Sequence, residues 1–176
     1  QLVAFTEASA HLASCPNWEP IVAGAHAVGG VVMVDGCQGI VHGGGRVKER
    51  GYDFYAMSGH KLYGPTGIGV LYGRKELLEE MPPFMGGGDM VDKVTFAKTT
   101  YAPLPLKYEA GTANFIGAVG LAAAIDYVES IGMEHIERHE QELLRYATEE
   151  LKKIEGLRIY GEAERRCPLI SFTIDG

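Results

Sequence analysis

The sequence predicts an α/β fold built around a largely parallel β-sheet. Three short apolar runs, at residues 2–6, 31–34 and 54–57, have the character of buried strands, the first of them covered on both faces. Residues 18–28 place apolar side chains at helical spacing between the first two runs. The order strand, helix, strand, loop, strand favours parallel pairing, because parallel strands need a long crossover connection.

Composition and charge narrow the class of protein. Of the 176 residues, 46% are hydrophobic and 22% are charged, which is ordinary for a globular domain with a real core. The formal net charge of -7 argues against nucleic acid or an anionic membrane surface as a partner. No apolar run approaches the ~20 residues of a membrane helix, and no signal peptide is visible. The three cysteines are too few and too scattered for a disulfide framework or a zinc site, and they suit a reducing, cytoplasmic setting.

Periodicity and chain-breaking residues predict the remaining elements. These are helices at residues 75–80, 115–131 and 133–154, and strands at residues 68–72, 157–160 and 169–174. Residues 84–107 lack clear periodicity, so we expect a long loop of the kind that carries function or shields a site. The long charged helix is the natural domain boundary. Both ends of the sequence carry a lone strand that needs a sheet, and residue 1 is Gln, so we expect a piece of a longer protein.

Polar side chains follow two of the predicted strands at the point where each strand ends. Asp35 and Gln38 follow the strand at residues 31–34, while Ser58, His60 and Lys61 follow the next one. Side chains just past the carboxyl ends of strands face the ligand crevice in open α/β sheets. A hydroxyl, an imidazole and an amine at this place can bind an anion and supply a nucleophile. For the trio alone, a solvated turn with a surface lysine is the alternative interpretation.

Together these residue types are the parts that pyridoxal phosphate needs. A carboxylate at Asp35 keeps a pyridine nitrogen protonated, which turns the ring into an electron sink. A nearby amine, Lys61, can form a Schiff base with the cofactor aldehyde and move protons at the substrate α-carbon. Ser58 and His60 offer donors to a phosphate. The alternative for Asp35 is a carboxylate that caps a strand-end turn.

Four blocks in order carry a resemblance to a known family. They are VDGCQ at residues 34–38, SGHKLYGPTGIG at 58–69, GGGDM at 86–90 and EAGTAN at 109–114. Together they closely resemble the cysteine desulfurases of the SufS/CsdA type, in the class V aminotransferase group of fold-type I enzymes that use pyridoxal phosphate. The resemblance covers essentially the whole chain, although a full family member is more than twice as long.

The resemblance implies a domain organisation. Residues 1–132 would be the second half of the cofactor-binding large domain, with its mostly parallel sheet. Residues 133–176 would be the linking helix and the beginning of a small α+β C-terminal domain, which is incomplete here. The family's persulfide-forming cysteine would lie beyond Gly176, and its histidine that stacks on the cofactor ring would lie before Gln1.

Each matching residue takes an implied role from the resemblance. Lys61 would be the Schiff-base lysine and the carrier of the proton. Asp35 would be the partner of the pyridine nitrogen, and Gln38 would donate a hydrogen bond to the phenolic oxygen of the ring. Ser58 and His60 would bind the phosphate.

Thr112 would reach the phosphate of the other subunit's site, which implies a homodimer. The alternative is that Thr112 caps the helix beginning at Phe115, and one hydroxyl can do both.

The implied reaction removes sulfur from L-cysteine, leaves L-alanine and passes the sulfur as a persulfide to an acceptor protein for iron–sulfur cluster assembly. The nearest enzymatic alternative is a selenocysteine lyase, since the cofactor machinery is shared. Another class V enzyme, such as an aminotransferase or an epimerase, is a further alternative. A non-catalytic scaffold that binds pyridoxal phosphate is the alternative from another class, and the residues after Gly176 would separate these.

The loop after the first strand departs from the family pattern. The family usually has a histidine and an asparagine there, approximately where this sequence has Glu7 and Ala10. The asparagine contacts cofactor and substrate, and Ala10 has no group to do so, which puts substrate handling in question. His11 and Asn17 are the candidates to compensate.

None of the three cysteines matches the family's persulfide-forming one. Cys37 occupies a small-residue position between Asp35 and Gln38, where we expect a packed thiol. Cys15 lies in a loop and Cys167 at the start of a predicted strand, and we expect both to be structural or incidental.

Overall fold

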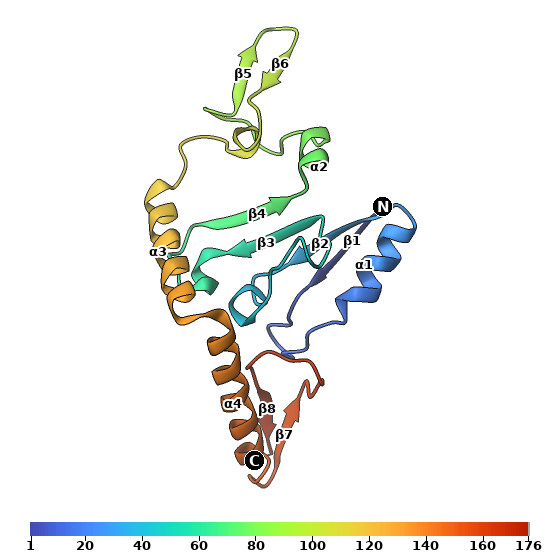
Figure 1. The fold of residues 1–176 in the computed structure, drawn as a ribbon, viewed down its shortest axis with the longest axis vertical. Coiled ribbons are helices and arrows are strands. Elements are labelled where there is room, and N and C mark those ends of the chain that lie inside the picture. The colour runs from blue at the N-terminus through green and yellow to red at the C-terminus, as the bar shows by residue number, and fades with distance from the viewer. Residues whose placement is uncertain (176) are drawn as a thin grey trace.

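The computed structural model describes residues 1–175 and contains a four-stranded sheet in the order β1-β2-β3-β4 (Figure 1). The strands are β1 at Leu2–Thr6, β2 at Val31–Asp35, β3 at Phe54–Ser58 and β4 at Gly69–Gly73. The first three pair in parallel, and β4 pairs with β3 in the antiparallel direction. The predicted α/β class with a mostly parallel sheet is therefore confirmed.

Helices, 3-10 turns and two hairpins complete the described chain. The helices are α1 at Trp18–Ala27, α2 at Lys75–Glu80, α3 at Phe115–Ile131 and α4 at Met133–Leu151. The 3-10 turns are η1 at Ile40–His42, η2 at Gly59–Leu62 and η3 at Leu106–Tyr108. The hairpin strands are β5 at Val91–Val94, β6 at Thr99–Tyr101, β7 at Leu157–Tyr160 and β8 at Ser171–Ile174.

The core sits around β2, the strand with parallel neighbours on both sides. Val32 and Val34 are fully buried and pack with α1 residues such as Val22 and Ala25. The prediction that β1 is covered on both faces is wrong: four of its five residues are exposed. The reason is its position, because β1 lies at the edge of the sheet that residues 1–175 form.

A second apolar cluster fixes the turns that follow β2 and β3. Val41 of η1, Leu62 of η2 and Val128 of α3 are buried together, with Met133 and Ile136 of α4 packed against them. The His42 imidazole adds a polar contact to α4, with Nδ1 lying 2.9 Å from Glu140 Oε2. The two turns are thereby anchored to the long helices.

The predicted loop at residues 84–107 instead contains the antiparallel hairpin of β5 and β6, which projects from the rest of the chain (Figure 1). Met90 is fully buried at its base, while Phe96 at its tip is fully exposed. Strands of three or four residues are too short to show a clear alternation of apolar and polar side chains, which explains the wrong prediction.

The helices α3 and α4 meet at Gly132 with a bend of 74°. Gly132 has φ of +89°, a conformation that other residues avoid, so the glycine that ends one helix also permits the sharp turn into the next. Within residues 1–175 no single helix is long and apolar enough to cross a membrane. Only the bent pair of α3 and α4, taken together, has the length and the apolar composition of a membrane span.

One buried carboxylate, that of Asp53, joins three elements at the amino end of β3. Oδ2 accepts a hydrogen bond from Val32 N at 2.7 Å and lies 2.8 Å from His26 Nε2, while Oδ1 accepts one from Arg74 Nη1 at 2.9 Å. Burial raises the pKa of the Asp53 carboxyl, but the hydrogen bonds from His26, Val32 N and Arg74 outweigh it and hold the pKa below its ordinary value.

We expect Asp53→Ala to destabilise the protein by about 3 kcal/mol, because the buried Val32 N loses its acceptor together with the ionic partners. Urea unfolding followed by circular dichroism measures this. Glu76→Ala is the matched control, since it removes only an exposed partner of Arg74 and should change stability little. Equal stability of the two variants would contradict the role of Asp53.

Acid should weaken the same contact. Since the pKa of Asp53 is lower in the folded than in the unfolded protein, its contribution is fully present above the ordinary value of 3.8 and is lost as the pH falls through the folded value. We expect the difference in unfolding free energy between wild type and Asp53→Asn to shrink over that range. A difference that stays constant down to pH ~2 would show that the carboxylate is not the titrating group.

Candidate functional site

The predicted cofactor residues meet at the carboxyl ends of β2 and β3. Asp35 is the last residue of β2 and Ser58 the last of β3, and the parallel register pairs Asp35 with Ala56, two residues before Ser58. His60 and Lys61 lie in η2 directly after β3. The structure therefore brings these residues to one edge of the sheet, as the sequence predicts.

Asp35 is exposed at this edge and is only partly engaged by the protein. Its Oδ1 accepts a hydrogen bond from Cys37 N at 3.0 Å, which is the capping contact considered as an alternative role. Within residues 1–175 its Oδ2 has no hydrogen-bond donor, so it remains able to accept one from a ligand. Gln38 follows in the same turn, half-buried.

The thiol of Cys37 links the two strand ends, as its Sγ lies 3.5 Å from Ser58 Oγ. This agrees with the predicted packed thiol. In η2 the apolar Leu62 is buried, while Lys61 is half-buried and His60 exposed, so the turn holds its apolar residue in the core and leaves its polar ones accessible to solvent in part or in full.

Thr112 lies on an exposed loop that other motif blocks hold in place. Gly111 N donates to Gly88 O at 2.9 Å, so the blocks at residues 86–90 and 109–114 are joined. The cap of α3 is Asn114, whose Oδ1 accepts from Gly117 N at 2.9 Å. The interpretation of Thr112 as the cap is therefore wrong. Its hydroxyl makes no hydrogen bond within residues 1–175.

Asn114 also ties α3 to the lysine-bearing block, because its Nδ2 donates to Gly67 O at 3.1 Å. Asn114 ends the EAGTAN block, but the resemblance implies no role for it. An Asn just before a run of helical periodicity is a recognised capping signal, and it could have identified this residue.

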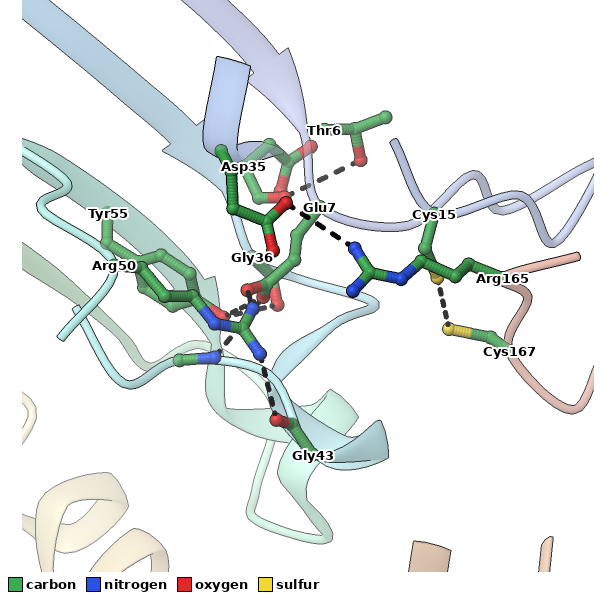
Figure 2. Close-up of polar contacts among 12 residues, drawn as sticks. Thr6, Glu7, Cys15, Asp35, Gly36, Gly43, Arg50, Tyr55, Arg165 and Cys167 are labelled. Atoms are coloured by element: carbon green, nitrogen blue, oxygen red, sulfur yellow. Dashed lines mark hydrogen bonds and ion pairs between the residues drawn. The ribbon is translucent and has the colours of Figure 1, made fainter. Parts of the chain in front are cut away.

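Glu7 follows β1 beside the same edge, but its side chain turns inward (Figure 2). Its backbone N donates to Asp35 O at 2.9 Å. The carboxylate is only 7% exposed and accepts hydrogen bonds from Tyr55 OH at 2.6 Å, from Gly45 N at 3.3 Å and from Arg50 Nη1. Glu7 departs from the family pattern in the sequence, but its ion pair with Arg50, 43 positions away, cannot be predicted from that departure.

Close glycine contacts surround that carboxylate. A Cβ atom at Gly39 or Gly44 would lie 2.1 or 2.3 Å from Glu7 Oε2, so a side chain at either position would displace the Glu7 carboxylate from its partners. Burial raises the pKa of Tyr55, and its hydrogen bond to Glu7 raises it further, which keeps the phenol a donor. Glu7, Arg50 and Tyr55 thus form a buried network beneath the strand ends.

The rest of the loop after β1 offers few groups to a ligand. Ala10 is exposed and apolar, and His11 is exposed. Asn17 already accepts a hydrogen bond from Arg165 Nη1 at 3.4 Å through Oδ1. Of the two residues considered as substitutes for the family's asparagine, only His11 is free of such a side-chain contact among the described residues.

A cavity of about 380 Å³ lies next to the network rather than at the cofactor edge. Glu7, Cys15, His42 and Arg50 line it together with residues of the segment between β7 and β8. None of the predicted cofactor residues lines this cavity. The candidate site is therefore an open edge of the sheet, and the cavity is a separate feature.

We expect Glu7→Ala to destabilise the protein by about 3 kcal/mol, because it leaves Arg50, only 19% exposed, without its charge partner and leaves Tyr55 OH only its longer hydrogen bond to Gly36 O, at 3.3 Å. Glu7→Gln keeps the shape of the side chain and one oxygen that can accept the hydrogen bond from Tyr55 OH, so it should destabilise the protein less than Glu7→Ala. Chemical unfolding of both variants and of Glu7→Ala/Arg50→Ala measures the coupling. Additive single effects would contradict a direct ion pair.

Comparison with known proteins agrees with this geometry. The chain matches the family described as aminotransferase class-V over residues 1–176. The probable cysteine desulfurase 1 of Mycobacterium leprae is 47% identical over 176 residues, which are 100% of this chain and 29% of that protein. A cysteine desulfurase of Serratia proteamaculans is 48% identical over 175 residues, which are 99% of this chain and 43% of that protein.

A solved structure shows the same fold. The crystal structure of the cysteine desulfurase CsdA from Escherichia coli superposes with a TM-score of 0.93 at 42% identity, over 100% of this chain and 44% of CsdA. This chain thus spans less than half the length of the relatives it matches here. The predicted resemblance and the predicted fold type I are confirmed. Since the family match covers every residue of the sequence, the chain belongs to the aminotransferase class-V family.

Proposed function

We propose that this chain forms the cofactor-binding part of a pyridoxal-phosphate-dependent cysteine desulfurase. One observation carries the proposal: Asp35 and the turn with Lys61 lie at adjacent strand ends, in a chain nearly half identical to proteins named cysteine desulfurase. The reaction of the whole protein would convert L-cysteine to L-alanine and deliver the sulfur as a persulfide.

The donor set at the strand ends fits pyridoxal phosphate. The free Oδ2 of Asp35 can accept a hydrogen bond from a protonated ring nitrogen, and Gln38 can donate one to the phenolic oxygen. Ser58 and His60 supply donors to a phosphate, and Lys61 Nζ supplies an amine. The set contains one anion for the cationic end of the ring and several donors for its anionic end.

When bound, pyridoxal phosphate supplies an electron sink for the bonds of the substrate α-carbon. The protein's part is to hold the cofactor and to move a proton at the substrate α-carbon. Lys61 Nζ would hold the cofactor through its aldehyde carbon and carry the proton at the substrate Cα. Cys37 N donates a hydrogen bond that fixes Asp35 Oδ1. The buried side chain of Leu62, packed with Val41 and Val128, fixes the turn that carries Lys61.

A homodimer is the assembly that this surface supports. Thr112 would reach the phosphate of the partner subunit's site, which its exposed and unengaged hydroxyl permits. Large apolar side chains lie exposed on the hairpin and on α3, which is typical of surfaces that another chain covers. They are Phe96 on the hairpin and Phe115, Ile116 and Val119 on α3, and Phe84 in the segment before the hairpin is exposed as well.

We place the boundary between the large and the small domain at Gly132, giving units at residues 1–132 and 133–176. The 74° bend at this position supports it. So does the sheet topology, since β7 and β8 pair only with each other among the described strands.

Selenocysteine lyase is the second candidate function. The loop after β1 is the reason to retain this candidate. The Glu7 side chain is paired with Arg50 and Tyr55, and Ala10 is apolar, so neither residue is available to contact a substrate. Substrate contacts at this loop would then differ from the family pattern. We further propose a cytoplasmic location, which the three free thiols suit, and a sulfur-acceptor protein as partner, which the proposed delivery of persulfide sulfur requires.

The test uses the full-length protein. We expect Lys61→Ala to abolish the visible absorbance band of the bound cofactor and to lower alanine formation from L-cysteine at least ~100-fold, because the amine both holds the cofactor and moves the proton. Lys75→Ala is the matched control, since that lysine is 78% exposed on α2. An unchanged band in Lys61→Ala would overturn the assignment.

Substrate choice needs its own measurement. Wild-type protein given L-cysteine and L-selenocysteine at equal concentrations should release alanine from both, with the higher kcat/KM for L-cysteine. A rate that is substantial only with L-selenocysteine would replace desulfurase by selenocysteine lyase, while absorbance with no turnover of either would favour a scaffold.

A further inference from the structure

Two cysteines far apart in the sequence lie side by side in the structure. The Sγ atoms of Cys15 and Cys167 are 3.5 Å apart, although 152 positions separate the residues (Figure 2). Cys15 lies in the loop after β1, and Cys167 lies in the irregular segment between β7 and β8. From the sequence alone both cysteines are expected to be structural or incidental, because their separation along the chain gives no sign of their contact.

Backbone hydrogen bonds hold the two segments together. Ser14 and Arg166 form an antiparallel bridge, flanked by a bond from Cys15 N to Arg165 O and one from Cys167 N to Ala13 O, each 2.9 Å long. The contact between the sulfurs therefore follows from paired backbones. Neither cysteine lies in a helix or a paired strand, so the sulfurs can approach without disturbing the main sheet.

The two thiols differ in environment. Cys167 is buried and Cys15 is half-buried, and both line the cavity of about 380 Å³ beside Arg50 and Arg165. The hydrogen bond from Cys167 lowers the pKa of Cys15 to about 7. The same contact and burial raise the pKa of Cys167. Cys15 is thus the thiolate that a small molecule in the cavity can reach, and Cys167 keeps its proton.

We propose that Cys15 and Cys167 are a modification site, a thiol pair that peroxide converts to a reversible disulfide. The Cys15 thiolate attacks one oxygen of hydrogen peroxide, the O–O bond breaks, and the hydroxide released takes a proton to become water. The sulfur of Cys167, giving up its proton, then attacks the Cys15 sulfenic acid, and the S–O bond breaks to release a second water. Two thiols and one peroxide become one disulfide and two waters.

The geometry suits the second step. The sulfurs must close from 3.5 Å to the ~2.05 Å of a disulfide, which needs a displacement of about 1.5 Å shared between two irregular segments. The bond would tie the loop after β1 to the β7–β8 hairpin, across the proposed domain boundary. It would also protect Cys15 from further oxidation, since the resolving thiol is already in contact.

Peptide mapping of the full-length protein after hydrogen peroxide treatment and thiol alkylation tests the proposal. Trypsin alone leaves Cys15 and Cys37 on one peptide, because no Lys or Arg lies between them, so a second protease that cuts after Trp18 or before Asp35 must separate them. We expect a linked peptide containing Cys15 and Cys167, lighter by two hydrogen atoms than its two parts and absent after dithiothreitol. This outcome is independent of cofactor binding and activity.

Variants separate the two steps. Cys167→Ser should stop at a Cys15 sulfenic acid that dimedone traps, while Cys37→Ser should still form the linked peptide. Oxidised wild type should unfold several degrees higher than reduced wild type, because the cross-link closes a long loop in the unfolded chain, and Cys15→Ser should lose that difference. Two results of the wild-type peptide map would overturn the proposal. One is oxidation of Cys15 to the sulfinic acid while Cys167 still reacts with the alkylating reagent, and the other is a disulfide between Cys15 and Cys37.

Discussion

The buried carboxylate of Asp53 is the interaction on which the sheet of this protein depends. It receives hydrogen bonds from β2, from α1 and from the residue that precedes α2, so it fixes the amino end of β3 against all three. A charge with 2% side-chain exposure is stable only when it is fully paired, and here three donors do this. Because one end of the strands is fixed, their register determines what meets at the other end.

At that other end the polar groups divide into two kinds. Asp35, Lys61 and their neighbours stay at an open edge with unused hydrogen-bonding capacity, which suits a ligand. Glu7 has the same chemistry as Asp35 and nearly the same location, yet its carboxylate is consumed by Arg50 and Tyr55. Two carboxylates at adjacent strand ends thus serve different purposes, and their hydrogen-bond partners distinguish them.

The sequence predicts local features well where the physical signal is local. Glycine at position 132 and the long periodic stretches on both sides of it predict α3 at its observed bounds, and α4 from its first residue. The β5–β6 hairpin was missed because its strands are too short for periodicity, and the burial of β1 was wrong because edge or centre is a property of the sheet. The sequence offers both Thr112 and Asn114 as caps for α3, and in the structure the cap is Asn114.

The sequence by itself determined the family and the candidate cofactor residues, since short motif blocks fix chemistry at strand ends whatever the rest of the chain does. Only the tertiary structure decided which side chains are free and which are paired. The Glu7 network joins residues more than 40 positions apart, and the Cys15–Cys167 contact joins residues 152 apart. Such contacts depend on where the whole chain folds back, and neither spacing nor residue type along the sequence encodes that distance.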